Sequence, residues 1–441
     1  MTLRRSDKSA IKLNKIRDRM TIHHSLALIS GTIIGSDNEY VTLTREDGLT
    51  FTWPIVDSLF KCFAPLKEGS NMITISGETI HPVSVDFELI YRPQIENQRC
   101  LRVIYLICRD EWGEIFEKGS FQSTPGDDNS LRSAKEKISL AVLMMQTFFG
   151  ETVPAHHTFQ VELDDDGQPL VYTFTLEQTY KDLWAMDQQQ LWDLVADCIL
   201  SSKLSNVNCK YLGFCSFSRY LCEPGTGRLK SSLTALDIRK MTRGYVALGG
   251  GGLALLSTSC LYSWPNRIDQ INECLTDSRL IDRTMLMDDS GNRGTYSGCY
   301  STTLGACIHE LGHIFDLGHN SMGMMSSHYP DIDKFFLVKP DGGSDTHKWW
   351  DRSSALILTS HKWFNNFPES KDAFKLSDST LRSRYGVQVI EYRGSNGVVK
   401  RFREFFLASK WVKLEIMPDD AYVIAMDIRG NIFKKELHPN N

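Results

Sequence analysis

Three histidines and a glutamate near residue 310 have the types and the spacing of a hydrolytic metal site. His309 and His313 are four residues apart, so on an α-helix their imidazoles lie on one face, one turn apart, and can bind one cation. Neutral imidazoles hold Zn²⁺ and leave a position open for a water molecule, whose proton a nearby carboxylate accepts during attack on a carbonyl group. Glu310 points off the axis of the two histidines and is the expected general base. This spacing predicts a catalytic zinc site.

A third histidine, His319, follows six residues after His313. If the helix breaks between them, the chain turns back and delivers His319 as a third ligand. The extended metzincin pattern, HExxHxxGxxH followed by a Met-turn, has the same arrangement, and Gly323-Met324-Met325 stands at the place of that turn. The chain departs from the pattern at Asp316, where glycine allows a left-handed backbone. Asp tolerates that conformation better than most residues, so the bend is expected either at Asp316 or at Gly318.

Other residues near the motif are candidates for supporting roles. Asp316 can orient a ligand histidine through its second ring nitrogen. His328 and Tyr329 are candidate donors for the oxyanion that forms when water attacks, and the alternative is that both are ordinary loop residues. The glycines from Gly249 to Gly252 lack the Lys-Ser/Thr of a phosphate loop. They favour close backbone approach in an edge strand beside the cleft, which pairs with an extended peptide.

The competing interpretation is a zinc site without catalysis. Structural zinc sites favour cysteine ligands and closed four-fold coordination, and the one nearby thiol, Cys307, lies on another face of the helix. A catalytically inactive zinc-binding scaffold that engages a protein partner is therefore the alternative function. The retained Glu310 favours the enzyme, because a structural site does not need this carboxylate.

The elements around the motif predict an α+β protein of several domains. Asp47-Gly48 between two alternating stretches indicates a β-hairpin in a β-sandwich, whereas later stretches mix strands and helices, as in a metzincin-like zinc-peptidase domain. The N-terminus is basic without an apolar segment, which favours a disordered leader over a mitochondrial presequence. We expect four parts: a leader (1–21), a β-sandwich domain (22–93), a zinc metallopeptidase domain (94–385) and a β-rich C-terminal segment (386–441).

The bulk composition narrows the class of protein and its partners. Of the 441 residues 41% are hydrophobic and 23% charged, an ordinary globular balance, and no apolar run approaches the length of a membrane span. A net charge of −5 gives no reason to expect nucleic acid as a partner. The 11 cysteines are scattered without a Cys-x-x-Cys pair or a secretory signal, which predicts reduced thiols in an intracellular protein of the cytoplasm or nucleus. A protein or peptide substrate is expected, and the oligomeric state stays open.

Three stretches of the chain resemble a family of zinc metallopeptidases from fungi and animals. They are "HELGHIFDLGHNSMGMM", the upstream "ALGGGGLALLSTSCLYSWP" and the downstream "WWDRSSALILTSHKWF". The resemblance covers most of the chain and implies Zn²⁺ as cofactor, with His309, His313 and His319 as ligands and Glu310 as catalytic base. It also implies Met325 as the Met-turn residue beneath the site. In that family DLGH is the usual form of the motif, so Asp316 belongs to it.

Overall fold

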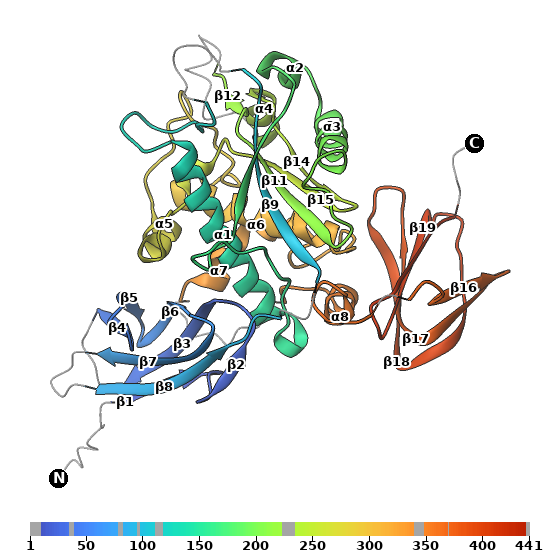
Figure 1. Cartoon of the computed structure of the whole chain (residues 1–441), viewed down its shortest axis with the longest axis horizontal. Helices are drawn as coiled ribbons and strands as arrows, with labels where there is room; N and C mark the ends of the chain where they lie inside the picture. The colour runs from blue at the N-terminus through green and yellow to red at the C-terminus, as the bar shows by residue number, and fades with distance from the viewer. Residues whose placement is uncertain are drawn as a thin grey trace.

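The N-terminal part of the chain is a single eight-stranded sheet, drawn in blue in Figure 1. The computed structural model describes residues 10–34, 39–77, 83–94, 98–110, 118–222, 234–338, 348–368 and 370–437. The strands of the first sheet lie in the order β1-β3-β6-β5-β4-β7-β8-β2. Their bounds are β1 (Ala10–Asn14), β2 (Met20–Ile22), β3 (Leu26–Ile34), β4 (Tyr40–Arg45), β5 (Thr50–Val56), β6 (Leu59–Pro65), β7 (Gly69–Gly77) and β8 (Val83–Tyr91).

Two expectations for this region need correction. The Asp47-Gly48 hairpin joins β4 and β5 as expected, but the strands form one continuous curled sheet rather than the two sheets of a sandwich. The stretch expected to be a disordered leader contains β1, paired with β3, and β2, paired with β8. The side chains of Ile11 and Leu13 pack against the core, which explains why this short, basic stretch is held in the sheet. Residues 1–9 lie outside the described residues.

The middle of the chain is built on a five-stranded sheet with the order β10-β9-β11-β15-β14. The first four strands in this order run parallel, and β14 runs antiparallel to β15 at one edge. The strand bounds are β9 (Cys100–Ile107), β10 (Val171–Thr175), β11 (Cys209–Cys215), β14 (Ala247–Gly250) and β15 (Leu253–Ser257). The glycine run therefore forms the edge strand β14 and its turn into β15.

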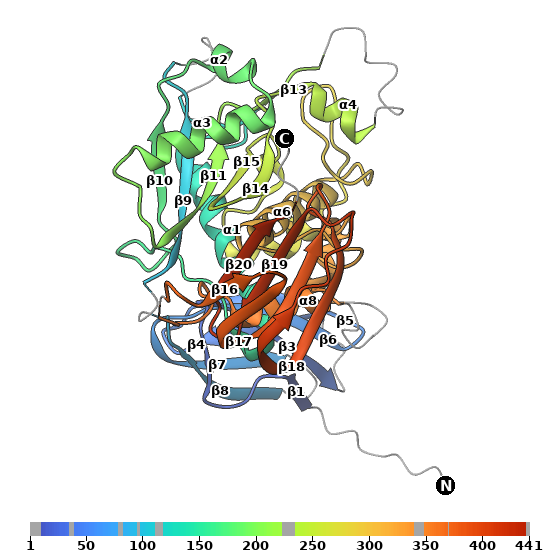
Figure 2. The same cartoon turned by 90° about the vertical axis from the view of Figure 1, so that its right-hand side faces the viewer.

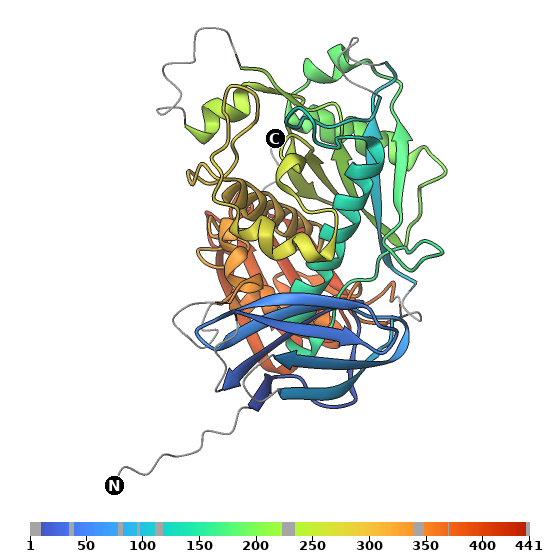
Figure 3. The same ribbon diagram turned by 90° about the vertical axis from the view of Figure 1, so that its left-hand side faces the viewer.

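Helices cover both faces of this sheet because its strands are apolar on both sides. In β9, Val103 and Tyr105 belong to one core cluster, and Ile104 and Leu106 belong to another. Helices α1 (Leu131–Thr152) and α6 (Tyr296–Ile314) pack on the first face, and α3 (Gln188–Leu200) packs on the second. Figure 3 shows α1, in teal, and α6, in ochre, on the side of the sheet that faces the viewer.

Short elements complete the middle region. They are α2 (Tyr180–Trp184), β12 (Arg219–Tyr220), α4 (Ala235–Lys240), β13 (Thr242–Arg243), α5 (Ile271–Thr276), the 3-10 turn η6 (Tyr329–Asp331), α7 (Asp333–Phe336) and α8 (Arg352–Ser360). Among the described residues, no helix has both the length and the apolar character needed to cross a membrane.

The C-terminal part is a second β-sheet, drawn in red in Figure 2. It contains β16 (Phe374–Ser377), β17 (Thr380–Arg393), β19 (Tyr422–Asp427) and β20 (Ile432–Glu436) in that order, and β18 (Val399–Lys413) also pairs with β17. The boundary expected between residues 385 and 386 falls inside β17. Gly386 has a φ of +96° where the β17–β18 register shifts, so a glycine inside a bulged strand resembles a break in the sequence.

Candidate metal centre

Helix α6 presents His309 and His313 from its last two turns. Thr295 caps its first turn by accepting a hydrogen bond from the Gly298 amide, and 14 of its 19 residues are buried between the central sheet and its neighbours. His309 is only 7% exposed. The Nε2 atoms of His309 and His313 lie 3.2 Å apart, so the four-residue spacing places both rings at one point.

The bend after α6 lies at Asp316. This residue has a φ of +64°, and Gly318 is absent from the left-handed region. The Asp316 amide donates to the His313 carbonyl at 3.1 Å, and the Leu317 amide donates to the Gly312 carbonyl at 3.0 Å. These two bonds form a Schellman cap in which aspartate occupies the usual glycine position. The left-handed bend that follows the helix therefore lies at the residue where the sequence departs from the familiar pattern.

The bend brings His319 to the other two histidines. Its Nε2 atom lies 3.1 Å from that of His313, and its ring centroid lies 5.2 Å from that of His309. Two nitrogens bound to one tetrahedral zinc at about 2.0–2.1 Å are themselves roughly 3.3–3.4 Å apart. Both pairs of Nε2 atoms that include His313 are thus near the separation that a shared zinc ion requires, and the ligand atoms of all three histidines lie within 4.8 Å of one another.

The protonation of the rings also fits a cation. The Nδ1 atoms of His309 and His313 lie 2.7 Å and 3.0 Å from the carbonyl oxygens of Met324 and Leu317. A ring that donates from Nδ1 to a carbonyl carries a lone pair on Nε2, so these lone pairs face one another and repel unless a cation lies between them. Burial lowers the pKa of His309 to about 4, and burial with the neighbouring His309 lowers that of His313 to about 3. Both rings are neutral at pH 7, as metal ligation requires.

Glu310 belongs to α6, and its carboxyl contacts the backbone of the edge strand β14. Burial raises the pKa of its carboxyl to about 7, although a hydrogen bond from the Gly249 backbone and the charge of Arg239 lower it. The two elements approach closely because residue 249 has no side chain: a Cβ atom there would lie 2.3 Å from the Glu310 carbonyl oxygen. The edge strand beside the carboxylate is the place that the glycine run predicts.

The Met-turn candidate lies beneath the histidines. Met325 is 1% exposed, and its Sδ atom occupies the space that a Cβ at Gly312 of α6 would enter. The Met324 amide donates to the Trp349 carbonyl at 2.8 Å, while the Met324 carbonyl is the partner of His309. The turn therefore supports the histidine helix from below and orients one of its rings.

Tyr329 and His328 occupy different environments. The Tyr329 ring lies over His309, with 5.2 Å between the centroids, whereas His328 is exposed and its Nδ1 pairs with the Ser326 hydroxyl at 2.9 Å. The carbonyl of Tyr329 approaches α6 at Gly305, where a Cβ atom would come within 2.0 Å. Of the two candidate oxyanion donors, Tyr329 is the one that contacts a site histidine.

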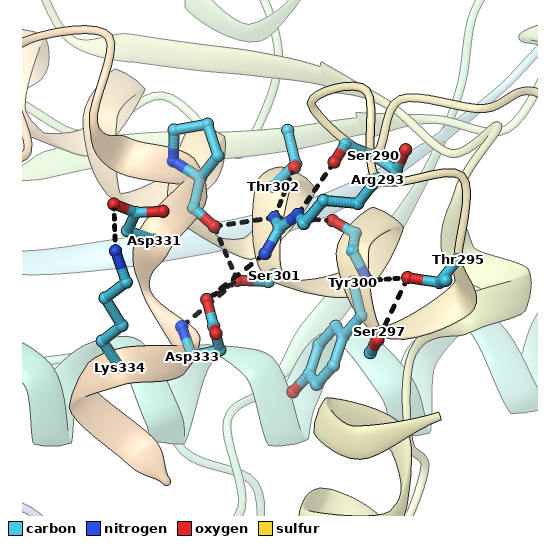
Figure 4. A network of polar contacts seen from close by, with 12 residues as sticks. Ser290, Arg293, Thr295, Ser297, Tyr300, Ser301, Thr302, Asp331, Asp333 and Lys334 are labelled. Atoms are coloured by element: carbon cyan, nitrogen blue, oxygen red, sulfur yellow. Dashed lines mark hydrogen bonds and ion pairs between the residues drawn. The ribbon is translucent and has the colours of Figure 1, made fainter. Parts of the chain in front are cut away.

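A polar network holds the Tyr329 segment against α6 (Figure 4). The guanidinium of Arg293 donates to Thr302 of α6 at 2.9 Å and to the Pro330 carbonyl at 2.8 Å. Ser301 of α6 donates to the same carbonyl and to Asp333, each at 2.7 Å. The orientation of Tyr329 thus depends on residues well away from the motif.

The carboxylate of Asp316 does not orient a ligand histidine, contrary to the expectation. It lies 3.3 Å from Nε2 of His361, a residue that is 1% exposed on the far side of the bend. Burial opposes ionisation of Asp316, but the bond to His361 and the charge of Lys210 hold its pKa below the usual value. The His309 and His313 rings are oriented by main-chain carbonyls instead.

Sequence reasoning missed residues that reach the site from distant segments. Arg239 of α4 lies near Glu310 and donates to Asp289 at 3.2 Å, and Arg393 of β17 donates to the Asp316 carbonyl at 2.6 Å. No local motif marks either arginine, because both contacts join segments far apart in the sequence.

The fold and the site define an α/β domain with three convergent imidazoles beside a partly buried carboxylate. The sequence profile of the family described as "Putative peptidase family" matches residues 10–400. The chain belongs to this family.

Two yeast relatives carry the same kind of name. A Saccharomyces cerevisiae protein named a "putative zinc metalloproteinase" is 25% identical over 304 residues, which cover 65% of this chain and 43% of the relative. A Schizosaccharomyces pombe protein of the same designation is 22% identical over 361 residues, which cover 75% of this chain and 54% of the relative. The chain thus spans about half the length of the curated relatives it matches.

Among solved structures, the chain is similar to OgpA from Akkermansia muciniphila. The catalytically inactive OgpA in complex with an O-glycopeptide has 12% sequence identity and a TM-score of 0.44, and the match covers 77% of this chain and 92% of that one. Wild-type OgpA matches with 14% identity and a TM-score of 0.41.

Proposed function

We propose that this protein is a zinc-dependent endopeptidase of metzincin-like type, with His309, His313 and His319 as ligands and Glu310 as general base. The observation that carries the proposal is the convergence of three imidazoles beside a partly buried carboxyl group: Nε2 of His313 lies 3.2 Å from that of His309 and 3.1 Å from that of His319. A zinc ion held there supplies a Lewis acid for a carbonyl oxygen and lowers the pKa of water toward about 7.

Glu310 has the properties of a proton acceptor in this reaction. Its carboxyl bonds the Gly249 backbone of β14, and burial brings its pKa to about 7. A group with a pKa near the working pH accepts a proton from the attacking water and releases it to the leaving amine.

The edge strand β14 supports an extended peptide as substrate. Within the described residues β14 pairs only with β15, so no second strand occupies its outer edge beside Glu310, where the Ala247 amide donates to Gln188 at 3.1 Å and the Gly249 backbone bonds Glu310. A substrate strand that pairs there is recognised through its backbone, which suits cleavage within a chain. Tyr329 over His309 is the proposed donor to the oxyanion, since a phenolic hydroxyl near the reacting carbonyl stabilises developing negative charge.

Glu310→Gln tests the proposal. The variant retains one zinc per chain and loses peptide hydrolysis by at least about 100-fold, because the amide has no basic oxygen for the proton. Hydrolysis is followed on denatured casein and a mixed peptide library, with and without a chelator. Glu273→Gln, at an exposed position on α5, is the control and leaves hydrolysis unchanged.

Two outcomes separate the enzyme from the scaffold. Full activity of Glu310→Gln removes this residue as the base. An absence of any chelator-sensitive cleavage by the wild-type protein, despite one bound zinc per chain, favours the catalytically inactive scaffold.

A further inference from the structure

The C-terminal sheet contacts the backbone of His319 directly. The His319 amide donates to the Gly397 carbonyl at 3.2 Å, and the Val399 amide donates to the His319 carbonyl at 2.9 Å. Together these bonds form an isolated parallel bridge between His319 and Val398. The turn between β17 and β18, residues 394–398, and the first residue of β18 therefore bond both the amide and the carbonyl of the third histidine.

Arg393, the last residue of β17, holds the bend that precedes His319. Its Nη2 donates to the Asp316 carbonyl at 2.6 Å, and its Nε donates to Glu391 at 2.8 Å. Arg393 is 7% exposed and Glu391 is 0% exposed. Gly318 makes this approach possible, because a Cβ there would lie 2.7 Å from Arg393 Nε and 2.8 Å from the Gly397 carbonyl oxygen.

The chemistry of this contact indicates a function beyond packing. Burying an arginine and a glutamate costs several kcal/mol per ion, and apolar residues of similar size often stabilise a fold as well or better. A buried guanidinium does offer short, directional bonds to two acceptors at once. Here one acceptor is a carboxylate of the same strand, and the other is the carbonyl of the left-handed residue between His313 and His319.

We propose that Arg393 is a positioning residue for the third zinc ligand and that the β17–β18 turn is part of the metal centre. The inference rests on the proposed ligand role of His319. Without the guanidinium, the loop from Asp316 to His319 keeps the Asp316–His361 contact and its main-chain bonds, but it loses the bond to the Asp316 carbonyl, and the third imidazole is held less accurately. Loss of such supporting contacts typically weakens metal binding by about 10–100-fold.

Zinc affinity of Arg393→Gln, measured by competition with a chromophoric chelator, tests the inference on the full chain. We expect at least about 10-fold weaker binding. The matched control is Arg401→Gln in the same sheet, which breaks an equivalent contact with Asp420, a buried carboxylate, at 2.6 Å. That control keeps its zinc affinity within about two-fold, since Arg401 has no contact with the bend.

Two further variants keep the test decisive. Arg393→Lys retains a positive charge opposite Glu391 and supports folding, but its ammonium group cannot bond both acceptors as the guanidinium does. Its zinc affinity is therefore expected to lie between that of the wild type and that of Arg393→Gln. His319→Ala reports on the proposed ligand set itself. If His319→Ala binds zinc like the wild type, the ligand assignment fails. If His319→Ala weakens binding while folded Arg393→Gln and Arg393→Lys do not, the inference about Arg393 is overturned.

A spectroscopic measurement separates positioning from general destabilisation. In cobalt-substituted protein, Arg393→Gln changes the visible absorption of the metal, because the geometry of the third nitrogen changes, whereas Arg401→Gln leaves the spectrum unaltered. Identical spectra for both variants contradict the positioning role.

A pair of cysteines carries a second, independent inference. Cys100 at the start of β9 lies directly opposite Cys209 in β11, and their Sγ atoms are 3.4 Å apart. Cys100 is partly exposed to solvent, whereas Cys209 is buried. Cross-strand partners in register have Cα atoms close enough for a disulfide bond without backbone movement.

The carboxylate nearest to the thiols argues against a second metal site. Glu162 lies close enough to complete a set of three ligands with Cys100 and Cys209. Both of its oxygens already accept hydrogen bonds from Arg102, at 2.5 Å and 2.6 Å. A divalent cation would have to displace this guanidinium or lie beside its positive charge, which is unfavourable.

We infer that Cys100 and Cys209 form a reversible disulfide on exposure to a peroxide. Hydrogen peroxide transfers one oxygen to a thiolate, which becomes a sulfenic acid, while the O–O bond breaks and the other oxygen leaves as hydroxide and takes up a proton to become water. The second thiol then attacks the sulfenic sulfur, the S–S bond forms and the sulfenic hydroxyl leaves with the thiol proton as a second water. The two sulfurs lose two electrons in total, and the peroxide gains them.

Mass spectrometry of peroxide-treated, alkylated protein under non-reducing conditions tests this inference. The linked Cys100–Cys209 peptide pair appears and is removed by dithiothreitol. The control pair is Cys260 with Cys299, which share a fully buried cluster and stay as thiols. Recovery of Cys100 and Cys209 as separately alkylated thiols overturns the inference. So does a second bound zinc that is lost in Cys100→Ser, because it assigns the pair to a metal.

Discussion

Asp316 adopts a backbone conformation for which glycine is the usual residue. Its φ of +64° completes the helix cap, and its carboxylate bonds His361 behind the bend. Gly318, the other candidate for the bend, serves a different purpose, because it leaves room for Arg393 and the β17–β18 turn. The roles of Asp316 and Gly318 thus depend on contacts with distant segments, and the local sequence gives no sign of these contacts.

Asp316→Gly is expected to be more stable than Asp316→Ala. Both variants lose the bond to His361, but only alanine retains a Cβ in the left-handed conformation, which costs roughly 1 kcal/mol. Urea unfolding of the zinc-loaded proteins measures the difference. An alanine variant as stable as the glycine variant contradicts the assignment of the bend to this residue.

His24 is expected to make the fold less stable in acid. Burial, with smaller contributions from His23 and His156, lowers its pKa from 6.5 to about 3. Glu151 lies 3.8 Å away, but burial raises the pKa of its carboxyl, so it does little to favour the charged ring. Below pH 6.5 His24 binds a proton in the unfolded chain, whereas in the folded chain it stays neutral down to about pH 3. Stability therefore falls through that window by up to about 1.4 kcal/mol per pH unit.

The variant His24→Leu isolates this contribution. Unfolding free energies of wild type and variant, measured at pH 7 and pH 5 in the same zinc state, differ in their pH dependence, because the variant lacks one group that charges on unfolding. Parallel pH profiles for the two proteins remove His24 as the source.

At the scale of elements, the close approach of α6 and β14 brings Glu310, the proposed general base, next to the edge strand. Gly249→Ala puts a methyl group 2.3 Å from the Glu310 carbonyl oxygen, so the edge strand has to move. We expect a loss of about 1–3 kcal/mol in unfolding free energy, together with reduced hydrolysis. The neighbouring Gly250→Ala is the control, since nothing lies within 4 Å of a Cβ there. Equal effects of the two substitutions contradict the role of this contact.

Local patterns in the sequence predict those elements whose partners are close in the chain. The Asp47-Gly48 hairpin, the helix of the histidine motif and the edge strand at the glycine run all follow from short-range periodicity and turn residues. The three histidines lie together because helix geometry sets the first two and a single bend sets the third.

Long-range pairing accounts for what the sequence does not reveal. The strand at Ala10–Asn14 is recognised only through its partner β3, and the bulge at Gly386 makes one long strand resemble two separate segments. The site residues Arg239 and Arg393 depend on contacts across many elements, and a single sequence offers no periodicity from which such contacts can be inferred.

At the scale of the whole molecule, the described residues form parts that share a core. One hydrophobic cluster runs from the N-terminal sheet through α1 and α6, and Phe63 of β6 packs on Phe336 of α7 with 5.8 Å between ring centroids. The cluster of three histidines in turn receives contacts from α6, from Met324 and from the C-terminal sheet. Zinc bound at the proposed site is therefore expected to stabilise more than α6 alone.

Removal of zinc with a chelator is expected to lower the unfolding temperature of the entire protein. A ligand that binds only the folded state at about 1,000 times its Kd contributes about 4 kcal/mol. Differential scanning calorimetry on the full chain measures this shift, and His319→Ala shows a smaller one because it binds zinc less tightly. An unchanged unfolding temperature after complete zinc removal contradicts the coupling of the metal to the fold.

The contact between the β17–β18 turn and His319 also limits where the chain can be truncated for expression. A fragment that ends at residue 385, where composition changes along the sequence, stops inside β17 and lacks both Arg393 and the turn that follows it. Such a fragment contains every residue of the histidine motif, yet it leaves the backbone of His319 unpaired and the loop before it unsupported. The smallest fragment expected to keep the three-histidine site intact therefore extends through the complete C-terminal sheet, to the end of β20 at Glu436.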